Sequence, residues 1–219
     1  MNSLGLEAVE KSFPLLLHGA LVTIEVTAMA LVLGALAGLL GGLARVSPLA
    51  PLRGLAAAYV SVIRGTPFIV QLFFVYYAFP QLGLQVPPMV AAVGCLAVYS
   101  GAYQTEIVRG AIESIERGQV EAARSLGLSA GQAMRYVVLP QAFLRMLPPL
   151  GNEFVALTKN SALVSLVTVQ ELLLSAQLII SATFQNFAVY LTIGVMYYII
   201  TSVVSTGTQL LERRLKVYV

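Results

Sequence analysis

Four ionisable side chains lie within long apolar stretches of the sequence, namely Glu25, Glu106, Glu153 and Lys159. A charge in such surroundings is costly, so residues of this kind commonly serve ion pairs, proton relays or ligand binding. Glu106 stands three residues before Arg109, which predicts an ion pair across one helical turn. We expect Glu25 to make structural or partner contacts and Lys159 to reach a membrane interface, which leaves Glu153 as the candidate for ligand chemistry.

Glu153 follows a pair of prolines at 148–149, which remove backbone donors and crowd the preceding helical turn. We expect the prolines to break a helix, and a new helix to begin at about Gly151 and Asn152. The free amides of such a helix start suit a carboxylate, while Glu153 suits an ammonium or guanidinium group. Glu153 and Asn160 fall on one helical face. An alternative stays open, in which Glu153 only caps its own helix.

Further polar groups stand on the two preceding apolar stretches. Tyr99 and Ser100 lie together on one of them, and Gln71 lies on the other at a comparable depth. We expect these groups to line the same passage as Glu153, although aromatic residues in a helical bundle more often serve packing. The candidate substrate-binding residues are Gln71, Tyr99, Ser100, Asn152, Glu153 and Asn160.

The composition indicates which elements must position these groups. Of 219 residues, 58% are hydrophobic and 11% are charged, whereas an ordinary soluble domain carries about 25% charged residues. Apolar stretches near the length of about 20 residues that a bilayer-spanning helix requires occur at residues 14–44, 58–80, 88–110, 136–160 and 184–210. The sequence therefore predicts an all-α polytopic membrane protein with about five transmembrane helices, in which residues 1–219 form a single domain.

The basic residues predict the orientation, because Lys and Arg favour the cytoplasmic side. Arg45 and Arg53 follow the first span, and four arginines lie in the loop at 109–135. Both loops are predicted to be cytoplasmic, with the N-terminus outside and the basic C-terminal tail inside. The apolar segment 161–181 would expel that tail if it crossed the membrane. We therefore interpret 161–181 as a helical excursion near the outer surface.

The end of the first predicted span is crowded with small residues, among them Gly34, Gly38, Gly41 and Gly42. Glycines spaced by about one helical turn let two helix backbones approach closely. We interpret this stripe as packing within the chain, the alternative being a seam between two copies.

The cytoplasmic loop at about 112–135 contains a short helix, predicted over Gln119–Leu126. Gly127 is expected to end it in the left-handed backbone conformation, and Ser129 to cap the helix that follows. A short helix with a face of small and charged residues suits docking into a groove of a partner. The residues of that face are Glu121, Ala122, Ala123 and Arg124.

This loop resembles the EAA signature of ABC-importer permease subunits, carried here by Glu121-Ala122-Ala123, Gly127, Val137 and Leu139-Pro140. Val137 replaces the usual isoleucine. Other elements resemble the polar amino acid branch of that family and extend the resemblance over about residues 14–175. They are Arg64-Gly65-Thr66-Pro67, Val70-Gln71-Leu72, Tyr103, Glu106, Arg109-Gly110, Gly118-Gln119 and Pro140-Gln141-Ala142. Asn160 stands where the family often has an acid, which puts a charged role at this position in doubt.

The resemblance implies that the short helix is the coupling helix, which seats in a cleft of a cytoplasmic ATPase. It implies a type I ABC-importer permease fold in a bacterial inner membrane. The implied partners are two ATPase subunits, a second permease subunit of the same or a similar sequence, an extracytoplasmic substrate-binding protein and an amino acid substrate. ATP and magnesium would be bound by the ATPase. Glu121 would hold the loop through a salt bridge or helix-end hydrogen bonds.

This chain itself is not expected to be catalytic or to bind a cofactor or metal. The sequence contains no glycine-rich phosphate loop ending in Gly-Lys-Ser or Gly-Lys-Thr. Its single histidine and single cysteine form no metal-binding motif, and its 13 basic residues are scattered, which argues against nucleic-acid binding.

Two other function classes stay open, a secondary carrier or channel that needs no ATPase, and a membrane scaffold. Both leave the EAA-like loop unexplained. The substrate is expected to be a cationic amino acid such as arginine, histidine or lysine, because Glu153 lies within the bundle. Glutamine is the next expectation.

Overall fold

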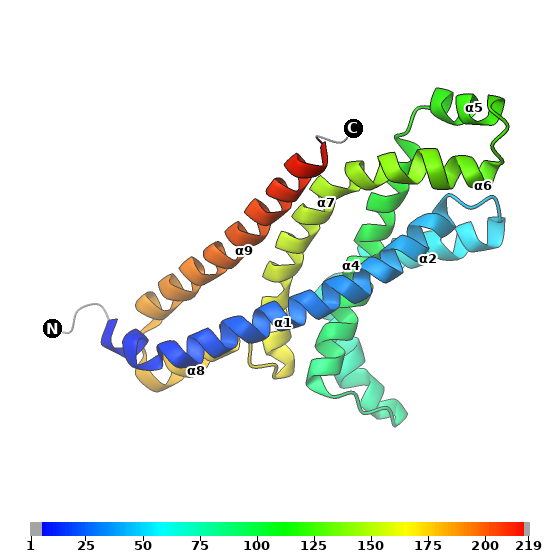
Figure 1. Ribbon diagram of the computed structural model, residues 1–219. Coiled ribbons are helices and arrows are strands. Elements are labelled where there is room, and N and C mark those ends of the chain that lie inside the picture. The colour runs from blue at the N-terminus through cyan, green and yellow to red at the C-terminus, as the bar shows by residue number, and fades with distance from the viewer. Residues whose placement is uncertain (1–5, 217–219) are drawn as a thin grey trace.

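The computed structural model describes residues 6–216, and every regular element within that range is a helix (Figure 1). Long helices form the bundle, and short ones make its turns. The α-helices are α1 (Leu6–Arg45), α2 (Ala50–Gly65), α3 (Phe68–Phe73), α4 (Pro88–Glu113), α5 (Arg117–Ser125), α6 (Ala130–Ala133), α7 (Leu139–Asn160), α8 (Leu172–Thr183) and α9 (Asn186–Lys216). The π-helical turns are η1 (Phe74–Ala78) and η3 (Met134–Val138), and the 3₁₀ turns are η2 (Phe79–Leu82) and η4 (Ser161–Val167).

The helices account for the predicted spans. Among the described residues, two stretches are long and apolar enough to cross a membrane alone, Val9–Arg45 and Asn186–Leu215. Two bent pairs of helices are also long and apolar enough to cross a membrane when the members of each pair are taken together. One pair is α2 with α3–η2, and the other is the two helices on either side of residues 168–171. The 26 residues of α4 reach about 39 Å, which exceeds the hydrocarbon core of about 30 Å. The prediction of an all-α protein with about five spans is confirmed.

The start of α1 and the end of α9 lie at opposite ends of the molecule, and α5 and α6 lie toward the end of α9 (Figure 1). An odd number of crossings places these two ends on opposite sides of the membrane. The assignment of the α5 side to the cytoplasm stays a prediction. The helix α9 continues to Lys216, so the basic residues of the predicted tail belong to the last helix and do not form a separate segment after it.

The second span is not the single straight helix predicted over 58–80. The helix α2 ends at Gly65, and α3–η2 turns away from it by 101°. Thr66 takes an extended conformation, with φ −122° and ψ 144°, because the ring of Pro67 disfavours helical backbone in the residue before it. A local Thr-Pro step therefore converts a continuous apolar stretch into a broken span.

The fourth span departs from its prediction in the opposite way. The helix α7 runs unbroken from Leu139 to Asn160 with the prolines at 148–149 inside it, so no new helix begins at Gly151. Proline itself has helical φ, and in membranes neighbouring helices compensate the lost hydrogen bonds. Gly151 packs so closely on Thr208 of α9 that an added Cβ would overlap it. The course of α7 changes direction in Figure 1, and internal prolines are a common cause of such a bend.

The chain breaks after α7 instead. Residues 161–167 tighten into η4, and Thr168 then takes a left-handed conformation at φ 65°. The helix α8 has 12 residues, about 18 Å, which is too short to cross a bilayer. The segment 161–181 is therefore no sixth span, as predicted. Figure 1 places α8 beside the first part of α1, at the end of the molecule opposite α5.

The helices α1 and α4 approach each other through the glycine stripe. A Cβ at Gly38 would overlap the side chain and backbone of Gln104, and a Cβ at Gly42 would overlap Val108. Both contacts lie within the chain, which confirms the interpretation of the stripe as internal packing. This close crossing holds α4, the most buried of the long helices, at the centre of the fold.

Candidate functional site

The loop between α4 and α7 carries the predicted short helix. The helix α5 covers Arg117–Ser125, beginning two residues before the expected start, and Gly127 follows in the left-handed conformation at φ +87°. Ser129 caps α6, accepting a hydrogen bond from the Gln132 amide at 3.3 Å, while its own amide donates to the Gln132 side chain at 2.8 Å. The predicted helix, glycine turn and N-cap are all confirmed as structure.

The helix α5 turns most of its surface to solvent. Ala123 is buried at 4% exposure and faces the protein, whereas Glu121, Ala122 and Arg124 are exposed. Leu126, at the end of the helix, is 84% exposed. A protruding leucine beside exposed small and charged residues forms a surface suited to a protein partner.

The carboxylate of Glu121 does not hold the loop. Within residues 6–216 it makes neither an ion pair nor a hydrogen bond, and only its backbone carbonyl accepts from Ser125, at 3.0 Å. The expected anchoring role of this carboxylate is therefore wrong for the isolated chain. It faces outward because Ala123, two residues further and about 200° around the helix, supplies the buried contact instead.

The predicted ion pair between Glu106 and Arg109 is present. Arg109 Nη2 lies 2.7 Å from Glu106 Oε2, and Arg45 Nε at the end of α1 donates to Glu106 Oε1 at 3.1 Å. Arg109 also pairs with Glu113. The Arg45 contact was not predicted, since 61 positions separate it from Glu106. Together these charges tie α1 to the end of α4 that leads into α5.

Glu153 lies on α7 facing α4, 9% exposed, and its Oε1 atom has no hydrogen-bond partner in the described chain. Ser100 stands next to its carboxylate. The hydroxyl of Tyr99 donates to that of Tyr103 at 3.2 Å and interacts with both Glu153 and Asn160. The structure thus brings Tyr99, Ser100, Glu153 and Asn160 together. Because α7 is unbroken here, Glu153 does not cap a helix start and no free amides accompany it.

Arg64 was not predicted as part of this group. Its guanidinium carbon lies 4.8 Å from the centre of the Tyr103 ring, and the charge of Arg64 acts on Glu153. The sequence contained one signal for it, a basic residue two positions before the Thr66-Pro67 break of a span. The group therefore presents a carboxylate and a guanidinium around two tyrosines, an arrangement complementary to a zwitterion with an ammonium and a carboxylate.

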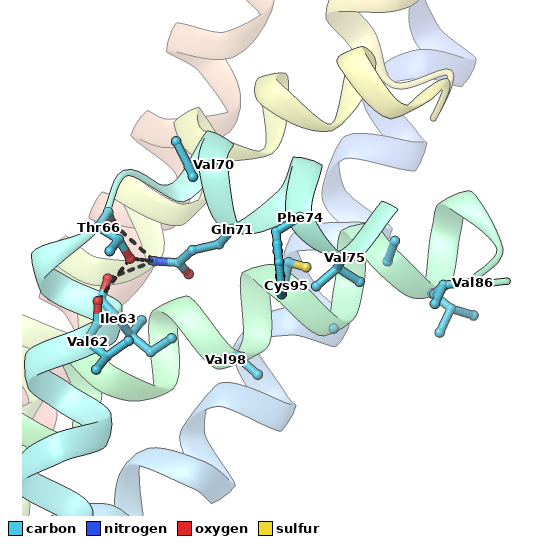
Figure 2. A pocket seen from close by; sticks show the side chains of 13 residues that line it. Val62, Ile63, Thr66, Val70, Gln71, Phe74, Val75, Val86, Cys95 and Val98 are labelled. Carbon is cyan, nitrogen blue, oxygen red and sulfur yellow. Dashed lines mark hydrogen bonds between the residues drawn. The ribbon is translucent and has the colours of Figure 1, made fainter. Parts of the chain in front are cut away.

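Gln71 and Asn152 do not join this group. The Gln71 side-chain amide donates to Ile63 O at 2.8 Å and to Thr66 Oγ1 at 2.8 Å. Gln71 thereby bridges the break of the second span (Figure 2). Asn152 is exposed and lines a pocket of about 210 Å³ with Thr208 and Gln209 of α9. One helix turns Glu153 toward α4 and its neighbour toward α9, because successive residues are about 100° apart around a helix.

A larger pocket of about 590 Å³ lies between α2–α3 and the first half of α4 (Figure 2). Its walls are almost wholly aliphatic and aromatic, and Thr66 and Gln71 are engaged with each other. It offers a polar solute few partners, so this pocket does not compete with the Glu153 group as a substrate site.

Glu171 is a buried charge that the sequence analysis did not single out. It is fully buried and caps α8, accepting from the Leu174 amide at 2.8 Å. Tyr197 of α9 donates to it at 2.7 Å, and Thr23 of α1 at 3.4 Å. The signal available in the sequence was an acid in an apolar stretch, the same signal that identified Glu153. Its satisfied hydrogen bonds make it structural.

Comparisons with known proteins agree with this architecture. Residues 18–217 match the family described as binding-protein-dependent transport system inner membrane component. The glutamine transport system permease protein GlnP of Escherichia coli K12 is 41% identical over 212 residues, 96% of this chain and 97% of that protein. The L-cystine transport system permease protein TcyB of Bacillus subtilis 168 is 38% identical over 215 residues, 97% of this chain and 92% of that protein.

A solved structure has the same fold. The crystal structure of an amino acid ABC transporter with histidines superposes with a TM-score of 0.92 at 40% identity, covering 98% of this chain and 100% of that one.

Proposed function

Because this chain belongs to the family of binding-protein-dependent transport system inner membrane components, the permease components of ABC importers, we propose that it moves a cationic amino acid or glutamine across the membrane. It is an inner-membrane protein of an amino acid importer. The energy comes from separate ATPase subunits, which engage the surface of α5, and the substrate is delivered by an extracytoplasmic binding protein. Two ATPase copies and a second permease subunit complete the proposed assembly.

The observation that carries the substrate assignment is the unpartnered Oε1 of buried Glu153. A buried acceptor without a partner is costly, and a ligand that supplies a donor removes that cost. The α-ammonium group of any amino acid supplies a charged donor, and a cationic amino acid carries a second one in its side chain. The guanidinium of Arg64, above the Tyr103 ring, suits the substrate carboxylate. The relatives GlnP and TcyB are named for glutamine and cystine, so family membership does not decide between substrates.

The exposed face of α5 supports the ATPase assignment. Glu121, Ala122 and Arg124 present two charged side chains and one small one to solvent, while buried Ala123 packs against the rest of the protein. Gly127 fixes the exit of the chain from α5 through its left-handed backbone. A helix held at one face and turned outward at the other transmits a push from its partner as a rigid body.

The test is reconstitution in liposomes of this chain with its ATPase and binding protein. We expect uptake of radiolabelled arginine, histidine or lysine that requires ATP inside the vesicles. Glutamine is measured in parallel. Uptake driven by an ion gradient without ATP would support a secondary carrier instead, and would refute the proposal.

A further inference from the structure

Arg145 reaches from α7 to the end of α4. Its Nη1 atom donates to the backbone carbonyl of Ser114 at 2.6 Å and lies 3.0 Å from Ser114 Oγ, across 31 positions of sequence. Ser114 is the first residue after α4, and only residues 115–116 separate it from the start of α5. One guanidinium group therefore contacts the short connection through which α5 is attached to α4.

The chemistry of this contact is favourable. The last carbonyls of a helix have no partner within the helix, and the helix dipole makes that end negative, so a cation is stabilised there. Ser114 Oγ donates to the Ala111 carbonyl at 2.7 Å, which leaves its lone pairs to accept from Arg145. A charge-assisted hydrogen bond of this kind is stronger and more directional than a contact between apolar groups.

Apolar packing surrounds the same connection. Ile115, Val138, Ala142 and Met146 form a buried cluster that joins the end of α4 to η3 and α7, and Val120 of α5 packs on it. Such packing holds the helices together but tolerates small rotations and slides of one against another. At this end of α4 and α7, the Arg145 contact is the side-chain hydrogen bond that joins them within the described chain.

Arg145 also lies on the helix of the substrate group, eight residues before Glu153. The helix α7 is continuous between them, with the prolines at 148–149 inside it. A displacement of Ser114 that pulls on Arg145 would act on the first half of α7, the helix whose second half carries Glu153.

From this arrangement we propose that Arg145 is a positioning residue for energy coupling, which transmits a displacement of α5 through Ser114 to α7. The inference rests on the proposed function, since it concerns how ATPase closure reaches the substrate group. Arg145 touches neither substrate nor ATPase in this role. It fixes the position of α7, which carries Glu153, relative to α5, which receives the displacement from the ATPase.

The experiment uses the complete transporter in liposomes and measures amino acid uptake and ATP hydrolysis in the same vesicles. Arg145→Ala is expected to lower the uptake per ATP hydrolysed about tenfold, the effect of losing one charge-assisted hydrogen bond, at an unchanged amount of assembled complex. Arg145→Lys keeps a charged donor and is expected to restore part of the ratio. Ser114→Ala keeps the carbonyl acceptor and is expected to change the ratio less than about twofold.

The matched control is Arg53→Ala, which removes another exposed guanidinium that donates to a backbone carbonyl, that of Ser47 at 3.2 Å. Its uptake per ATP is expected to equal that of the wild type. A wild-type ratio for Arg145→Ala overturns the proposal, as does a loss of uptake that follows only the amount of assembled complex. Wild-type vesicles that show no ATP-driven uptake would overturn the proposed function, and this inference with it.

Discussion

The hydroxyl of Tyr197 on α9 donates to the carboxylate of Glu171 at 2.7 Å, in a site where Glu171 is fully buried. The same carboxylate caps α8 and accepts from Thr23 of α1. Helices α1, α8 and α9 therefore meet at one acid, and α1 is distant from the other two in sequence. This junction lies by α8, at the end of the molecule opposite α5 (Figure 1).

Tyr197→Phe tests how much this junction stabilises the fold. The variant leaves one oxygen of a buried carboxylate without its strongest donor, so we expect a loss of about 1–3 kcal/mol. The measurement is thermal unfolding of the purified protein in detergent. Tyr198→Phe is the control, because the Tyr198 side chain is 72% exposed. Equal melting temperatures for the two variants would show that the hydrogen bond contributes nothing.

Glu153→Gln tests the substrate site. The amide keeps the size of the side chain but removes the charge that a guanidinium or ammonium group would meet. We expect arginine-stimulated ATP hydrolysis by the reconstituted transporter to fall at least about tenfold, as for the loss of a charged hydrogen bond, while basal hydrolysis is retained. Lys159→Gln, an exposed change on the same helix, is expected to leave stimulation intact. Unchanged stimulation in Glu153→Gln would refute the binding role.

Gly127→Asp tests the loop after α5. The residue has φ +87° with no atom within 4 Å of an added Cβ, so the expected defect comes from backbone strain of about 1–2 kcal/mol rather than from a clash. We expect the protein to insert in the membrane but to transport no substrate, measured by uptake and by membrane fractionation. Gly131→Ala also meets open space and lacks the positive φ, so it is the matched control. Normal uptake by Gly127→Asp would contradict the coupling assignment.

Gly38→Ala tests the crossing of α1 and α4. An added Cβ would overlap both the side chain and the backbone of Gln104, and overpacking of this kind costs about 1–3 kcal/mol. The expected result is a lower unfolding temperature in detergent. Gly54→Ala, where a Cβ meets nothing within 4 Å, is expected to be neutral or stabilising because alanine favours helix. A Gly38→Ala variant as stable as Gly54→Ala would show that the helices separate without cost.

The candidate site could be predicted only in part from the sequence. Tyr99, Ser100, Glu153 and Asn160 were expected together and do lie together. Gln71 and Asn152 were expected with them, but their side chains face the span break and α9. Arg64 was missed because the Thr66-Pro67 step turns the chain by 101°, and the direction of such a turn depends on packing that no local pattern encodes.

By itself the sequence determined the features that depend on near neighbours. Apolar stretches of spanning length gave the number of crossings, the backbone freedom of glycine gave the turn at Gly127, and three-residue spacing gave the pair of Glu106 with Arg109. Tertiary structure alone decided that the prolines at 148–149 stay inside α7, where Gly151 packs closely against Thr208 of α9. It also decided which acid is satisfied. Glu171 receives donors from α1 and α9, whereas Glu153 keeps a free oxygen, and only the packing of distant helices distinguishes the two.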